Sequence, residues 1–134
     1  MPDKPYLYLK CSTEQGILVL TITEPRIQGD QVAEALRKEM LSALEESGVN
    51  MVVVDCQHTQ YLSSTAFRPF LALRRELQKS GGRIVLCGLK GVVRDVFLTT
   101  RMVSSSGSVT APFELDTDVP AALARLTGPP PPQK

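Results

Sequence analysis

Hydrophobic and polar positions divide the first third of the chain into two extended segments and a helix. Tyr and Leu alternate over residues 6–9, and residues 17–23 are rich in β-branched side chains, so two strands are predicted. Gln15-Gly16 between them favours a hairpin turn. From Asp30 onward apolar side chains recur at steps of three and four, which predicts an amphipathic helix. Its expected apolar side consists of Val32, Ala33, Leu36, Met40, Leu41 and Leu44. Asp30 is expected to cap the start of this helix, and Gly48 to adopt the left-handed conformation after its end.

Two continuous apolar runs, residues 51–56 and 83–89, predict strands that are buried on both faces. A polar loop at residues 57–65 and a second amphipathic helix lie between them. The helix ends at Ser80-Gly81-Gly82, and its expected apolar side consists of Ala66, Phe67, Phe70, Leu71 and Leu77.

The last third of the chain predicts two shorter helices and one strand. Residues 92–97 suggest a short helix, residues 103–108 have loop composition, and Pro112 confines a strand at residues 109–115 to a sheet edge. Asp118 and Pro120 fit the start of a final helix, whose apolar residues are Ala122, Leu123 and Leu126.

The predicted order of elements is β-β-α-β-α-β-α-β-α. Strands linked by helices pair in parallel through right-handed crossovers, and the opening hairpin adds antiparallel pairing. A chain of 134 residues has the size of one domain. We therefore expect a single α/β domain over residues 1–127, a small mixed β-sheet with four helices, followed by a proline-rich disordered tail at residues 128–134.

Charge and composition narrow the functional classes. Fifteen Lys and Arg against fourteen Asp and Glu give a net charge of +1, so no strong field attracts nucleic acid or an anionic membrane. No apolar run is long enough to span a bilayer, and the N-terminus lacks the apolar stretch of a signal peptide. The three cysteines, Cys11, Cys56 and Cys87, are odd in number and unclustered, which suggests reduced, mostly buried thiols in a cytoplasmic protein.

Catalytic and cofactor motifs are not found in the sequence. It contains neither a G-x-x-x-x-G-K-[ST] phosphate loop nor a G-x-G-x-x-G dinucleotide motif. Cys56 and His58 are two ligands without a second pair, which does not complete a zinc site. We expect no catalytic residues, no metal and no cofactor, and so a binding protein rather than an enzyme.

Three adjacent hydroxyl side chains stand where the polar loop enters the second helix: Ser63, Ser64 and Thr65. A helix start exposes unpaired amides and the positive end of the helix dipole, so an anion is favoured there. The common explanation for Ser or Thr at such a place is an N-cap. The other explanation is a site of modification or binding.

The stretch from Met51 to about Phe97 resembles the STAS family, the domain of anti-sigma factor antagonists. The family pattern is an apolar strand ending in Asp, a loop, an apolar pair, Asp-Ser-[Ser/Thr]-[Gly/Ala], an amphipathic helix, Gly, and a second apolar strand followed by Gly. The matching segments here are Val52-Val53-Val54-Asp55, Tyr61-Leu62, Ser63-Ser64-Thr65-Ala66-Phe67, Leu71-Ala72-Leu73-Arg74-Arg75, Gly81-Gly82-Arg83-Ile84-Val85-Leu86-Cys87-Gly88 and Val92-Val93-Arg94-Asp95-Val96-Phe97. More loosely, the resemblance extends over residues 6–126.

The resemblance implies a role in a partner-switching system that regulates transcription. Ser64 matches the family's phosphorylated Ser, with Ser63 and Thr65 as alternative acceptors, and Ser63 stands where the family has Asp. The implied partners are an anti-sigma factor with serine kinase activity and a phosphatase acting on phospho-Ser64. The implied contact surface runs over the consecutive residues Ser63, Ser64, Thr65, Ala66, Phe67 and Arg68.

Because Ser63 stands where the family has Asp, a second interpretation is also favoured. In it the chain is a STAS scaffold or adaptor module that is not phosphorylated and works inside a larger signalling or transport complex. Two further residues have open roles. Asp55 either bonds loop amides or contacts the partner. Pro69 either stands near the first position of a helix that begins later, or distorts the first turn.

Overall fold

The computed structural model describes residues 6–102 and 113–128. In this part of the chain the strands are β1 (Leu9–Glu14), β2 (Ile17–Ile22), β3 (Arg26–Ile27), β4 (Met51–Asp55), β5 (Tyr61–Leu62), β6 (Arg83–Cys87) and β7 (Glu114–Asp116). The α-helices are α1 (Asp30–Ser47), α2 (Phe67–Gln78), α3 (Gly91–Thr99) and α4 (Val119–Thr127), and a single 3-10 turn, η1 (Ser64–Ala66), precedes α2.

Five strands form the central sheet in the order β1-β2-β4-β6-β7. β1 and β2 form an antiparallel hairpin, whereas β2, β4, β6 and β7 pair in parallel. The hairpin turns at Gln15 and Gly16, which both have positive φ, 56° and 76°, as the tight turns that suit strand twist require. The predicted mixed α/β sheet with four helices is confirmed.

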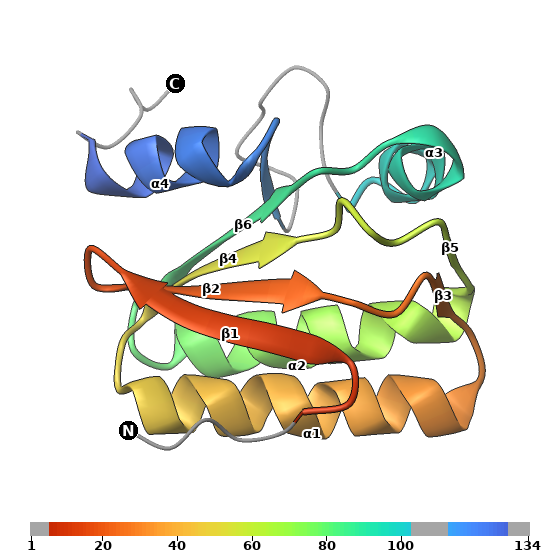
Figure 1. The fold of residues 1–134 in the computed structure, drawn as a ribbon, viewed down its shortest axis with the longest axis horizontal. Coiled ribbons are helices and arrows are strands. Elements are labelled where there is room, and N and C mark those ends of the chain that lie inside the picture. The colour runs from red at the N-terminus through yellow and green to blue at the C-terminus, as the bar shows by residue number, and fades with distance from the viewer. Residues whose placement is uncertain (1–5, 103–112, 129–134) are drawn as a thin grey trace.

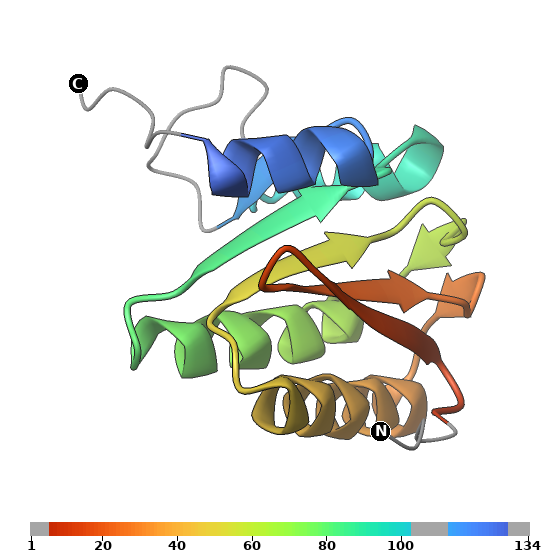
Figure 2. The same cartoon turned by 60° about the vertical axis from the view of Figure 1, so that its left-hand side comes forward.

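Helices cover both faces of this sheet (Figures 1 and 2). α1 and α2 lie side by side on one face and α4 lies on the other, so the parallel strands are buried on both sides. Successive residues of each strand alternate between the two faces. The side chains in the cluster with α1 and α2 include Leu18, Leu20, Ile22, Val52, Val54, Ile84 and Leu86. Those in the cluster with α4 are Ile17, Val19, Val53, Val85 and Cys87.

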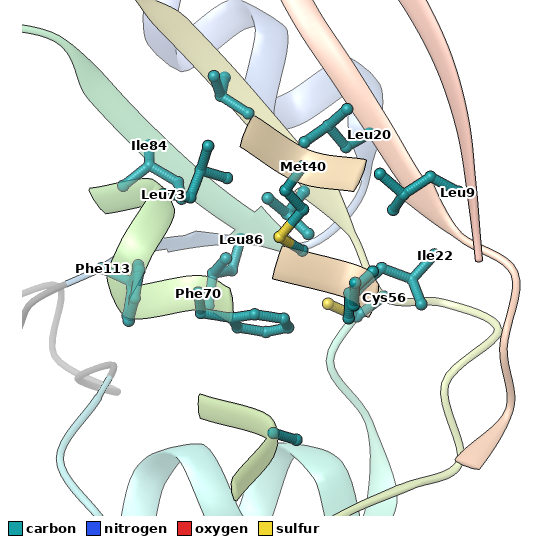
Figure 3. Close-up of a cluster of buried hydrophobic side chains, with 14 of the residues drawn as sticks. Leu9, Leu20, Ile22, Met40, Cys56, Phe70, Leu73, Ile84, Leu86 and Phe113 are labelled. Atoms are coloured by element: carbon teal, nitrogen blue, oxygen red, sulfur yellow. The ribbon is translucent and has the colours of Figure 1, made fainter. Parts of the chain in front are cut away.

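The larger core lies between the sheet and the α1–α2 pair, and it contains most of the aromatic residues. Figure 3 shows Phe70 of α2 among core side chains that include Met40 of α1 and Leu86 of β6. The Phe70 ring stacks on Phe97 of α3 with ring centroids 5.4 Å apart and meets Phe113 edge-on at 6.4 Å. α3 is therefore anchored at one end of the sheet through the aromatic cluster.

The predicted helix boundaries are confirmed at two places. Gly48 follows α1 in the left-handed conformation, and its N–H donates to the Leu44 carbonyl. Asp118 caps α4, accepting a hydrogen bond from the Ala121 N–H at 2.9 Å.

Three predictions about local structure are wrong. Asp30 does not cap α1: Gly29 occupies the cap position, and Asp30 is already the first helical residue. The first strand begins at Leu9 rather than Tyr6, because the N–H groups of the residues just before it bond to a side chain of α1. The Leu7 and Tyr8 N–H groups donate to the Glu39 carboxylate at 3.0 and 2.9 Å, and the Leu7 side chain is exposed.

The third wrong prediction is that residues 57–65 form only a loop. They contain β5, which pairs in parallel with β3 in a separate two-stranded sheet. The predicted loop at residues 103–108 and the proline-rich tail, apart from Gly128, lie outside the described residues, as does the first part of the strand predicted at 109–115. β7, which follows, lies at the sheet edge as expected.

Candidate functional site

Ser64 is exposed at the point where the chain passes from β5 into α2. Ser63 before it is extended, with φ −92° and ψ 172°, and Ser64 begins the 3-10 turn η1, which continues into α2 at Phe67. This geometry places the Ser64 hydroxyl on the surface at the start of a helix of the main core.

The two-stranded sheet holds the backbone beneath this hydroxyl. The Gln60 and Tyr61 N–H groups both donate to the Pro25 carbonyl, at 2.7 and 3.1 Å, and the Ser63 N–H donates to the Ile27 carbonyl at 2.9 Å. Ile27 and Leu62 turn inward and are buried in the main core. In Figure 1, β3 and β5 lie together near the start of α1. The segment that carries Ser64 is thus fixed by backbone pairing and by burial.

The three neighbouring hydroxyls are not equivalent. The Ser63 Oγ and Thr65 Oγ1 atoms lie 2.8 Å apart and share a hydrogen bond, and both side chains are half-buried. No side-chain oxygen caps η1 or α2, so the N-cap explanation does not account for these residues. Within the described part of the chain Ser64 has no side-chain hydrogen bond, which leaves its hydroxyl the most accessible of the three.

Charged side chains lie on the segments that adjoin Ser64 in the chain or pair with them. Arg68, on the first turn of α2, donates across to the Asp30 carboxylate on α1 at 3.5 Å. The Arg26 guanidinium lies over the Tyr61 ring, 4.8 Å from its centroid. Sequence reasoning missed both contacts, because only the pairing of β3 with β5 and the packing of α1 on η1 and α2 bring these residues together.

Ala66 and Phe67 have a different role from the one that the resemblance implied. Both side chains are buried in the main core, and the Phe67 ring meets Phe97 edge-on with centroids 5.1 Å apart. They fasten η1 and α2 to the core and present no side-chain surface to a partner. Of the six residues expected to form a contact surface, Ser64 and Arg68 are exposed, and Ser63 and Thr65 are half-buried.

Pro69 is the third residue of α2, which begins at Phe67 after the 3-10 turn η1. The Phe67 N–H donates to the carbonyls of Ser64 and Thr65 in a tightened turn. Because Pro69 stands in the first turn of α2, its missing N–H falls among amides that have few intrahelical acceptors, and the helix start accommodates it.

Asp55 accepts hydrogen bonds from the loop that follows β4, which confirms the prediction that this residue bonds loop amides. It is buried at the end of β4, and its carboxylate accepts hydrogen bonds from the Gln57 backbone N–H at 3.1 Å and the Gln57 side-chain amide at 2.7 Å. Gly88 packs directly against this turn and has a positive φ of 74°. The turn fixes the first residues of the segment that leads to Ser64.

The cysteines are free thiols, with Cys11 exposed and the other two buried. Cys56 and Cys87 belong to the cores on opposite faces of the sheet, so their side chains point apart. Desolvation by burial raises the pKa of both thiols, that of Cys87 to about 12. Neither has the lowered pKa of a reactive cysteine.

In residues 6–102 and 113–128, no three His, Cys, Asp or Glu side chains lie together in an arrangement that could hold a metal ion. None of the helices described combines the length and the apolar character needed to cross a membrane.

Comparisons with known proteins agree with this geometry. The family model of the STAS domain matches residues 8–114. The Bordetella bronchiseptica protein named anti-sigma factor antagonist BtrV is 40% identical over 65 residues, which cover 48% of this chain and 55% of that protein. The matched region therefore spans about half the length of that relative.

Solved structures share the fold at low identity. SpoIIAA of Bacillus, an anti-sigma factor antagonist in its unphosphorylated form, gives a TM-score of 0.64 at 17% identity, covering 90% of this chain and 98% of that one. An anti-sigma factor antagonist from Mycobacterium paratuberculosis gives 0.67 at 18% identity, covering 92% and 97%. The family match extends over most of the chain, and it includes the strands from β1 to β6, η1 and α2. The chain belongs to the STAS domain family, and within it is similar to anti-sigma factor antagonists.

Proposed function

We propose that this protein is an anti-sigma factor antagonist in a partner-switching system and that Ser64 is its switch. In the unmodified state it binds an anti-sigma factor, which frees a sigma factor for transcription. The anti-sigma factor has serine kinase activity and phosphorylates Ser64, the complex dissociates, and a phosphatase restores the binding state. The observation that carries this proposal is the exposed Ser64 hydroxyl, free of side-chain bonds, on a rigidly held segment at the start of α2.

The charge change explains how one small modification can act. A phosphate adds about −1.5 to −2 charges and three acceptor oxygens. Within the domain it is tolerated, because it stands at the positive end of the α2 dipole and on the surface. At an interface the same charge must lose its water and meet the partner's groups, so binding weakens. SpoIIAA, which shares this fold, has been solved in unphosphorylated and phosphorylated forms.

The proposed docking surface consists of the exposed side chains around Ser64. It includes Arg68 and the accessible parts of Ser63 and Thr65, with Arg26 over Tyr61 beside them. Ala66 and Phe67 support it from below. Since Arg26 and Arg68 are both exposed, the partner surface is expected to carry acidic residues.

A second candidate function is a STAS adaptor that binds without phosphorylation. One observation favours it: Ser63, which stands where the family has Asp, shares its hydroxyl with Thr65 and supplies no charge beside Ser64. A kinase that requires an acidic residue before the acceptor would pass over this protein, whereas docking would remain.

Phosphorylation by candidate anti-sigma kinases tests the first proposal directly. The purified chain is incubated with each kinase and ATP, and the phosphate is located by mass spectrometry. Wild type, Ser63→Ala and Thr65→Ala should each gain phosphate on residue 64, and Ser64→Ala should gain none. Phosphate on Ser63 or Thr65, or modification of Ser64→Ala to the wild-type extent, would overturn the assignment.

Binding to the anti-sigma factor tests the electrostatic mechanism. Ser64→Asp should weaken the complex by about tenfold or more, which corresponds to about 1.4 kcal/mol. Ser64→Asn, whose side chain has the shape of Asp but no charge, should bind with an affinity close to that of wild type. Circular dichroism should show the same fold for both variants, because the side chain is exposed. Equal affinity of the two variants would favour the adaptor.

A further inference from the structure

Arg68 follows Ser64 by four residues, which is about one helical turn. Ser64 begins η1 and Arg68 is the second residue of α2, so the pair spans the junction of a continuous helical segment. Side chains four residues apart on a helix are neighbours, and an arginine is long enough to reach an atom built onto the earlier residue. Both side chains are exposed, so no core packing prevents their contact.

The present partner of Arg68 holds it weakly. Its guanidinium donates to the Asp30 carboxylate at 3.5 Å, with the two side chains 67% and 79% exposed. Exposed ion pairs of this kind contribute little to stability, since water and salt screen them. The next acid on α1, Glu34, accepts from Arg37 at 3.1 Å, so it is already bound. Arg68 can therefore exchange partners with little loss.

A phosphate on Ser64 would be a stronger acceptor than Asp30. A guanidinium presents a planar set of N–H groups that matches two phosphate oxygens, and such charge-assisted pairs are shorter and stronger than single contacts. We propose that Arg68 leaves Asp30 and binds the phosphate on Ser64, so that modification also breaks the exposed ion pair that joins α1 to the start of α2. This inference rests on the proposed phosphorylation of Ser64, and it assigns Arg68 a positioning role rather than a catalytic one.

Two changes in the docking surface follow from this capture. The phosphate is held over the first turn of α2 in one orientation rather than projecting freely. Arg68 is neutralised and Asp30 loses its cation, so the net charge of the group formed by Arg26, Asp30, Ser64 and Arg68 changes from positive to negative. A partner that recognised the basic surface then meets a fixed negative one.

Phosphorus NMR on a protein with phosphoserine placed at residue 64 tests the capture. The phosphoserine is introduced during translation by an expanded genetic code, so no kinase is needed. A neighbouring cation favours the doubly charged phosphate and lowers its second pKa. The midpoint of the pH titration should therefore lie lower in wild type than in Arg68→Gln, with Arg68→Lys between them. Asp30→Asn should lower the midpoint further, because a competing carboxylate is lost.

Arg75→Gln is the matched control, since Arg75 is an exposed arginine on the same helix, far from the first turn. Its midpoint should equal that of wild type. Equal midpoints in wild type and Arg68→Gln, with both proteins folded by circular dichroism, would overturn the capture.

The same protein samples distinguish a failure of the phosphate capture by Arg68 from a failure of the proposed switch at Ser64. If phosphoserine at residue 64 weakens anti-sigma factor binding but Arg68→Gln leaves the titration unchanged, the switch stands and the capture is wrong. If the titration depends on Arg68 but phosphoserine leaves partner binding unchanged, the capture stands and the switch is wrong.

Discussion

Replacing Gly88 with alanine tests whether the turn formed by Asp55 and Gln57 depends on close backbone contact. Gly88 follows β6 with φ +74°, and its N–H donates to the Thr117 carbonyl at 3.2 Å. A Cβ added there would lie 2.8 Å from the Gln57 backbone nitrogen and 2.9 Å from the Asp55 Oδ1 atom. The Gln57 nitrogen is a backbone atom, and the buried Asp55 carboxylate is held by two hydrogen bonds from Gln57, so the turn itself must move.

The expected loss in the free energy of unfolding has two parts, and the same substitution at a second glycine separates them. An alanine in the left-handed region costs about 1 kcal/mol relative to glycine. Overpacking against fixed atoms adds about 1–3 kcal/mol. Gly88→Ala should therefore lower the free energy of unfolding by about 2–4 kcal/mol. Gly81 has nearly the same φ, +72°, but nothing within 4 Å of its added Cβ, so Gly81→Ala should cost about 1 kcal/mol.

Urea unfolding followed by far-ultraviolet circular dichroism measures both variants against wild type. Typical domains have total stabilities of about 5–15 kcal/mol, so both variants should fold and give separable midpoints. Midpoints that coincide would refute the close-contact argument, because the two variants share the dihedral strain and differ only in what the new methyl group meets.

Two further changes follow from the cores on the two faces of the sheet. Phe70→Ala removes the ring between Phe97 and Phe113 and should cost about 3–5 kcal/mol in the same assay, and a loss below 1 kcal/mol would contradict the central position of this ring. Burial raises the pKa of the Cys56 and Cys87 thiols above their ordinary 9.0, so the unfolded chain loses these protons at lower pH than the folded chain does. The free energy of unfolding should therefore fall as pH rises above 9 towards 12, by up to about 1.4 kcal/mol per pH unit for each thiol. The double variant Cys56→Ala, Cys87→Ala should show a shallower alkaline slope in denaturation at each pH, and an unchanged slope would assign the loss to other groups.

Long periodic segments could be predicted from the sequence, and very short ones could not. α1 extends over eighteen residues, and its repeat identified the buried residues Ala33, Leu36, Met40 and Leu44. β3 and β5 have two residues each, too few for any periodicity, and their pairing joins segments more than thirty positions apart. The sequence therefore predicted the main sheet but not the small one that supports Ser64.

At the candidate site, the position of the hydroxyls was predictable and their surroundings were not. Ser63, Ser64 and Thr65 were singled out from their place before an amphipathic helix, and the family resemblance pointed to Ser64, whose side chain is exposed in the structure. Residue type alone suggested that Asp30 would cap α1, but Gly29 occupies the cap position and Asp30 faces Arg68 instead. Ala66 and Phe67 follow Ser64 closely in sequence yet point inward, because side chains of a helical segment are distributed around its axis and these two face the core.

The pairing of β3 with β5 makes the recognition element discontinuous. A synthetic peptide copying residues 57–68 would contain Ser64 but neither the Pro25 and Ile27 carbonyls nor the core beneath Leu62. Without these supports nothing offsets the conformational entropy that the peptide would lose by holding the bend that displays the hydroxyl. An enzyme that reads this shape should ignore linear fragments on a peptide array and modify only the intact domain.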